Sequence, residues 1–196
     1  MGKGRLEAFS DGVIAIIITI MVLELKAPRD DAGFMALLPV FAGYVLSFVY
    51  VGIYWNNHHH LLQISERVNG SVLWANLHLL FWLSLIPFVT AWIGNSHFGS
   101  HAVAAYGALL LLCAAAYSLL ENRLRRLHGA SSKLSLALRQ TGKEKVSIVL
   151  YAAAMGLAFV SPAVACLLYT AVALMWFVPD RRFEAALAAA EEELSS

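Results

Sequence analysis

The sequence predicts an all-α membrane protein with six transmembrane helices and both termini in the cytoplasm. Three observations lead to this prediction. The 196 residues are 60% hydrophobic and 14% charged, whereas a soluble domain is about 45–50% apolar and about 25% charged. Apolar stretches long enough to cross a bilayer recur along the chain. The basic residues gather in alternate connecting segments, as expected for segments that lie in the cytoplasm.

Six stretches have roughly the 20 mostly apolar residues that a membrane-spanning helix needs. They cover residues 8–25, 34–55, 72–94, 102–120, 146–160 and 162–178. Pro28 and the charged residues at 29–31 end the first stretch, and the polar segment 94–99 separates the third from the fourth. Ser161 and Pro162 predict a turn between the last two stretches, because the residue before a proline is pushed out of helical geometry. Residues 1–196 are expected to form a single six-helix transmembrane domain.

The orientation follows from the basic residues. With the N-terminus inside, only Lys26 and Arg29 lie on the outer side, which leaves 12 of the 14 lysines and arginines in cytoplasmic segments. This asymmetry predicts that both termini are cytoplasmic.

The composition also excludes several classes of protein. The apolar surface exceeds what one small soluble core can bury, which excludes a soluble enzyme and a disordered chain. A net charge of +1 gives no signal for a nucleic-acid partner. Cys113 and Cys166 both lie in apolar runs, which predicts buried thiols and neither a disulfide nor a metal pair.

Polar residues near one end of the first three stretches predict a cluster within the membrane. Asp11 lies about two turns into the first helix, where an unpaired carboxylate is costly. Donors are available from the end of the second stretch and the start of the third, and these are Trp55, His58, His59, His60, Asn76 and His78. We therefore expect neighbouring helices to supply hydrogen bonds to Ser10 and Asp11.

The first helix also carries an apolar stripe. At about 100° per residue, the stripe is roughly 100° wide and contains Ile16, Thr19, Ile20 and Leu23, with Gly12 extending it inward. Asp11 lies about 220° from Ile16 and therefore faces elsewhere. By spacing alone, such a stripe is typical of a surface that contacts lipid or another helix.

The string Arg5-x-x-x-Phe9-Ser10-Asp11-Gly12, followed by Ala15-Ile16-x-x-Thr19, resembles the transmembrane protein 175 family of potassium channels. The resemblance extends to the number of spans, which is six, to the Trp55…His58-His59 end of the second stretch and to Asn76 in the third. From about residue 99 onward, only the topology supports it.

The resemblance implies a homotetramer in which the first helix of each copy lines a central pore. It implies that Ile16 forms a hydrophobic constriction, that Ile20 and Leu23 form apolar rings further outward, and that Thr19 supplies a hydroxyl layer linked to cation preference. The family motif maps to an interhelical network of Arg5, Phe9, Ser10, Asp11, Trp55, His58, His59 and Asn76. Glu24 near the outer mouth is expected either to attract cations or to be an exposed helix-end charge.

The implied partners are further copies of the chain, the lipid bilayer and monovalent cations. Potassium is the implied permeant ion, with no cofactor and no enzymatic activity. The resemblance also implies a multi-pass protein of a bacterial plasma membrane. The Thr-Val-Gly-Tyr-Gly string of carbonyl-lined potassium filters is absent from the sequence.

Three alternatives remain open from the residues alone. Asp11 with His58 or His59 could relay protons in a coupled transporter, although no inverted repeat is visible. The histidines at 58–60 and 78 could ligate haem, but three consecutive histidines diverge by about 100° on a helix. Ser10 and Asp11 with a histidine could form a hydrolase site, but adjacent residues also diverge.

Overall fold

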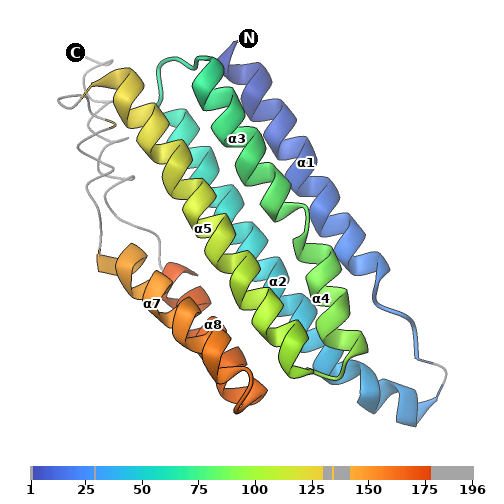
Figure 1. Cartoon of the computed structure of the whole chain (residues 1–196). Helices are drawn as coiled ribbons and strands as arrows, with labels where there is room; N and C mark the ends of the chain where they lie inside the picture. The colour runs from blue at the N-terminus through green and yellow to red at the C-terminus, as the bar shows by residue number, and fades with distance from the viewer. Residues whose placement is uncertain (1, 29, 130–133, 135–141, 178–196) are drawn as a thin grey trace.

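The computed structural model describes residues 2–28, 30–129, 134 and 142–177, and all the regular structure in these ranges is helical. The helices are α1 (Lys3–Leu23), α2 (Asp31–Gln63), α3 (Gly70–Leu83), α4 (Ile86–Asn95), α5 (Ser100–His128), α7 (Gly142–Leu157) and α8 (Pro162–Phe177). Figure 1 shows the long helices running side by side, with the N-terminus at the end of the bundle where α5 finishes.

The expected all-helical membrane architecture is confirmed in its main features. Among the described residues, four helical stretches are long and apolar enough to cross a membrane, and they are Lys3–Leu23, Gly33–Gln63, Gly70–Asn95 and Ser100–His128. The fifth and sixth predicted spans correspond to α7 and α8, which have 16 residues each. Residue 178, most of the basic segment after α5 and the C-terminal segment lie outside the described residues.

The third predicted span is confirmed as one apolar stretch, Gly70–Asn95, but its helix is interrupted near the middle. α3 ends at Leu83 and α4 begins at Ile86, with Pro87 in the first turn of α4. Proline has no backbone N–H and is favoured in the first turn of a helix. The stretch 72–94 was expected to be continuous, and Pro87 is the signal that this expectation overlooked.

Side-chain caps fix where α2 and α3 begin. The Asp30 carboxylate accepts a hydrogen bond from the Gly33 N–H at 2.7 Å, and the Asn69 side chain accepts from the Val72 N–H at 3.0 Å. Such caps satisfy backbone donors that a helix start leaves without partners. α2 then continues to Gln63, well past the predicted end at residue 55, so His58 is helical.

The core is centred on α5, which packs against α3, α4, α7 and α8. Buried tyrosines join these helices. The Tyr50 hydroxyl donates to the Tyr169 carbonyl at 2.6 Å, and the Tyr169 hydroxyl donates to the Val103 carbonyl at 3.1 Å. These two bonds tie α8 to both α2 and α5. On the other side of the bundle, α1 packs on α2, α3 and α4.

Gly107 is required for the close packing of α8 on α5. A methyl group at this position would collide with the Tyr169 hydroxyl and would lie 2.8 Å from Met155 Cγ. We expect Gly107→Ala to lower the free energy of unfolding by about 1–3 kcal/mol, because overpacking displaces these side chains. Thermal unfolding in detergent measures the effect. Gly52→Ala is the matched control, since no atom lies within 4 Å of the added methyl; equal stability of both variants would contradict the prediction.

Candidate functional site

The first helix has one face inside the chain's own core and one face outside it. Leu6, Ser10, Ile14, Ile17 and Met21 form the buried face. The opposite side presents the predicted stripe: Ile16 is 58% exposed, Ile20 is 44% exposed and Leu23 is 79% exposed. Gly12 and Thr19 are exposed with them. Among the described residues, none covers this continuous apolar surface of α1.

Thr19 places one hydroxyl on this apolar surface. Its Oγ1 donates a hydrogen bond to the Ile16 carbonyl at 2.8 Å. The hydroxyl proton is thereby directed at the helix backbone, and the oxygen lone pairs remain available as acceptors. Such an oxygen suits contact with a cation and not with an anion.

A groove of about 780 Å³ runs between α1 and α4 beside the stripe. Ile16, Ile20 and Glu24 line it from α1. Phe88 and Trp92 line it from α4, and their side chains are 66% and 40% exposed. Sequence reasoning did not assign α4 to this site. The break at Pro87 was the available signal that this helix has its own direction.

A buried chain of hydrogen bonds connects α1 to α3 and α2. The Ser10 hydroxyl donates to the Leu6 carbonyl at 2.9 Å and accepts from Asn76 Nδ2 at 2.9 Å. Asn76 Oδ1 lies 2.7 Å from His58 Nε2. Ser10 and Asn76 are 0% exposed, and His58 is 1% exposed. Three helices are thus fixed to one another by partners that water does not reach.

The network also assigns the hydrogen on the imidazole of His58. An amide oxygen can only accept, so Nε2 of His58 carries the hydrogen that it donates to Asn76. Nδ1 of His58 is buried without a hydrogen-bond partner among the described residues. Of the histidines considered from the sequence, His58 is therefore the one joined to Ser10 through Asn76.

Asp11 belongs to a second, more exposed layer at the same end of α1. Trp55 Nε1 donates to Asp11 Oδ1 at 3.0 Å, and the Trp55 ring stacks on His59 with centroids 5.9 Å apart. His59 Nδ1 lies 3.8 Å from Glu7 Oε1. Glu7 was not predicted as a site residue. Its position four residues before Asp11 puts both carboxylates on the same side of the helix.

Arg5 and Phe9 are not brought into this network. Within the described chain, the Arg5 side chain forms neither a hydrogen bond nor an ion pair, and the side chains of Arg5 and Phe9 are both exposed. Phe9 precedes Ile16 by seven residues, about two helical turns, so it lies on the exposed face and not on the face of Ser10. The same spacing relates Arg5 to Gly12.

The hydrolase alternative finds no support in this geometry. The Ser10 hydroxyl is held by Leu6 and Asn76, and Asn76 separates it from His58. Of the other histidines weighed, His78 accepts from Trp82 Nε1 at 2.8 Å.

The fold and the site together define a class of protein. It is a bundle of apolar helices whose first helix is anchored by buried polar contacts and presents an apolar face, with one hydroxyl, outside its own chain.

Comparison with known proteins identifies the family. The family described as endosomal/lysosomal potassium channel TMEM175 matches residues 5–87. A potassium channel of Chryseobacterium sp. is 56% identical over 189 residues, 95% of this chain and 98% of the relative. A potassium channel of Chamaesiphon minutus is 32% identical over 176 residues, 81% of this chain and 85% of the relative. The chain belongs to the TMEM175 family, which is a family of ion channels and not of enzymes.

A solved structure supports the same assignment. The crystal structure of a lysosomal potassium-selective channel TMEM175 homolog from Chamaesiphon minutus superimposes with a TM-score of 0.75 at 27% identity. The match covers 90% of this chain and 96% of that one. The resemblance inferred from the motif in the first helix is therefore confirmed, and it extends over the fold beyond residue 99.

Proposed function

We propose that this protein conducts monovalent cations, with a preference for potassium, through a pore lined by α1 from four copies of the chain. The observation that carries the proposal is the exposed stripe of α1, which pairs large apolar side chains with the single hydroxyl of Thr19. The relatives of this chain from Chryseobacterium and Chamaesiphon are named potassium channels, and these names support potassium as the permeant ion of this chain.

In this proposal, Ile16 is the main barrier to conduction. Four isoleucine side chains around an axis form a ring that a hydrated cation passes only by losing water, and such a ring can also close by dewetting. Ile20 and Leu23 form further apolar rings toward the outer end of α1. A small outward movement or rotation of α1 is enough to widen all three rings.

The buried network positions the pore face. The bonds from Asn76 to Ser10 and His58 hold α1 in one rotation against α2 and α3. This rotation directs Ile16 away from the chain's own core. Arg5 and Phe9, on the same face as Ile16, lie at the inner mouth where copies meet, and Glu24 attracts cations at the outer mouth.

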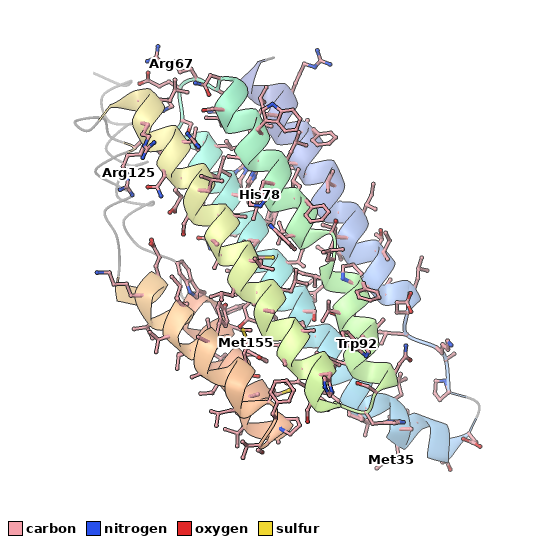
Figure 2. All side chains as sticks on the ribbon, viewed as in Figure 1. Met35, Arg67, His78, Trp92, Arg125 and Met155 are labelled. Carbon is pink, nitrogen blue, oxygen red and sulfur yellow. The ribbon has the colours of Figure 1, made fainter. Side chains whose placement is uncertain are left out.

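The proposed orientation has both termini in the cytoplasm of a bacterial cell, with residues 1–196 as one channel domain in the plasma membrane. Arg67 and Arg125 lie at the end of the bundle that holds the N-terminus, whereas Met35 lies at the opposite end (Figure 2). This distribution agrees with the excess of basic residues expected on the cytoplasmic side.

Reconstitution tests the function directly. Purified protein in liposomes should pass potassium down its gradient and sodium more slowly, and the detergent-solubilised particle should have the mass of four chains. Unitary currents in planar bilayers distinguish a channel from a proton-coupled transporter, which gives none. Flux that requires a pH gradient, without unitary events, would replace the channel proposal with the transporter alternative.

Thr19→Ala tests the hydroxyl layer. We expect current to persist while the permeability ratio of potassium to sodium falls toward unity, because no side-chain oxygen then replaces water lost at the constriction. Reversal potentials under bi-ionic conditions measure the ratio. Thr170→Ala is the matched control, since Thr170 on α8 also donates its hydroxyl to the backbone of its own helix, at 2.9 Å from the Cys166 carbonyl. An unchanged ratio in Thr19→Ala would remove Thr19 from the selectivity mechanism.

A further inference from the structure

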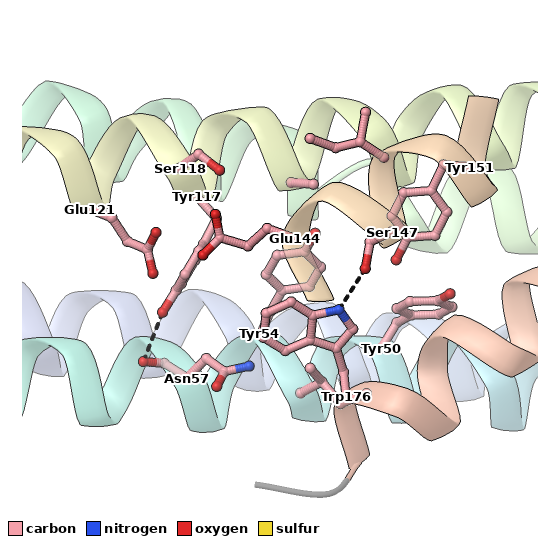
Figure 3. Close-up of a pocket in the computed structure, with 13 residues that line it drawn as sticks. Tyr50, Tyr54, Asn57, Tyr117, Ser118, Glu121, Glu144, Ser147, Tyr151 and Trp176 are labelled. Carbon is pink, nitrogen blue, oxygen red and sulfur yellow. Dashed lines mark hydrogen bonds between the residues drawn. The ribbon is translucent and has the colours of Figure 1, made fainter. Parts of the chain in front are cut away.

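A cavity of about 60 Å³ lies between α2, α5, α7 and α8, on the side of the bundle away from α1. Its lining includes five aromatic rings, from Tyr50, Tyr54, Tyr117, Tyr151 and Trp176, and two carboxylates, from Glu121 and Glu144 (Figure 3). No lining residue belongs to α1. The cavity is therefore separate from the proposed pore.

Glu121 is the unusual group in this cavity. It is only 8% exposed, and its carboxylate points into the cavity (Figure 3). It forms no hydrogen bond or ion pair with another described residue, and Glu144 adds a second negative charge beside it. Arg125, one turn further along α5, favours the charged form of Glu121 electrostatically. A buried carboxylate without a bonded partner is costly to ionise, and a cation bound beside it offsets that cost.

The polar tips of Tyr117 and Trp176 are bonded to other residues of the cavity lining. Tyr117 donates its hydroxyl to the Asn57 carbonyl at 3.1 Å, and Trp176 Nε1 donates to Ser147 Oγ at 2.8 Å. The rings are left to line the cavity. Lys143 Nζ already lies 5.9 Å from the centroid of the Trp176 ring, which is a cation–π distance.

We propose that this cavity binds the ammonium group of a small organic amine. Aromatic rings around a cation, with a carboxylate beside it, are the features that recognise alkylated ammonium groups. A metal ion fits less well, because calcium takes about six to eight oxygen ligands and the lining is mostly aromatic. At roughly 10–15 Å³ for each water site, the volume suits a head group of a few heavy atoms. The ammonium belongs either to a free amine or to a lipid head group.

Calorimetric titration of the detergent-solubilised protein with tetramethylammonium chloride tests the proposal. We expect saturable binding, and we expect Glu121→Gln to weaken it by about tenfold, the effect of losing one charged contact. Glu66→Gln is the matched control, since Glu66 is an exposed carboxylate in the segment between α2 and α3. It should bind like the original protein. Trp176→Leu should weaken binding independently of Glu121. Sodium chloride titrations correct for ionic strength.

Three results would overturn the proposal: no saturable binding, equal binding by the original protein and both cavity variants, or loss of binding in Glu24→Gln, which would place the ligand at the pore mouth. The measurement is of binding and not of flux, so its outcome is independent of the channel proposal.

Binding measurements in lipid nanodiscs identify the source of the ammonium group. Competition by phosphatidylethanolamine, but not by phosphatidylglycerol, assigns a lipid head group, and equal binding in both lipids assigns a free amine.

Discussion

Ile16→Asn is expected to raise conductance severalfold and to reduce the discrimination among monovalent cations. An amide at the proposed constriction holds water, so the ring no longer dewets and a passing ion keeps more of its hydration shell. Because Ile16 is 58% exposed in its own chain, the substitution removes little packing. The yield of assembled protein should therefore stay near that of the original. Single-channel recording and size-exclusion chromatography on the same preparation measure both quantities.

Ile14→Asn is the matched control for this experiment. It makes the same change two residues earlier on α1, but Ile14 is only 2% exposed and lies in the core. Burying an unpaired amide costs about 1–3 kcal/mol, so this variant should lose folded protein. If Ile16→Asn also lost folded protein and left permeability ratios unchanged, the stripe would be a packing surface and not a pore lining.

Asn76→Ala is expected to give the largest loss of stability among substitutions in the buried network. It removes the acceptor of the His58 N–H and the donor to the Ser10 hydroxyl together. At about 1–3 kcal/mol for each buried polar group left without a partner, the expected loss is about 2–4 kcal/mol, since Ser10 retains its bond to the Leu6 carbonyl. Thermal unfolding in detergent, together with the yield of the assembled particle, measures it.

Asn122→Ala is the control for Asn76→Ala, because Asn122 is exposed on α5 and surface changes of this kind usually stay within about 0.5 kcal/mol. In Asn76→Ala, any assembled protein should also conduct abnormally, since α1 is no longer held in one rotation. Normal stability of Asn76→Ala would show that the three helices are held together by apolar packing alone.

The positions of the first four spans follow from the sequence, because their length and hydropathy are local properties. Pro87 shows where this local reading was incomplete. A proline in an apolar run of this length is compatible with one kinked helix or with two helices. In the structure α4 is a separate helix that packs against α2 and α5. The length of α2 was underestimated for a related reason: polarity rises at Asn56, but nothing stops a helix there.

Some features of the candidate site could also be predicted from the sequence, and others could not. Helical spacing separated Ile16 from Asp11 on α1, since spacing along one helix depends only on its period. Phe9 was grouped with Ser10 by the family motif, but Phe9 is exposed whereas Ser10 is buried. Which histidine joins the network could not be read from three consecutive imidazoles, because the choice depends on how α2 is rotated against α3.

The sequence by itself determined the class of protein, the direction of the α1 stripe and the family, because each depends on composition, period or a contiguous motif. Only the tertiary structure decided that Asn76 bridges Ser10 and His58, and that Glu121 meets Glu144 in an aromatic cavity. These contacts join residues that are 18 to 66 positions apart in the chain. Their geometry is set by how rigid helices pack, which no local pattern encodes.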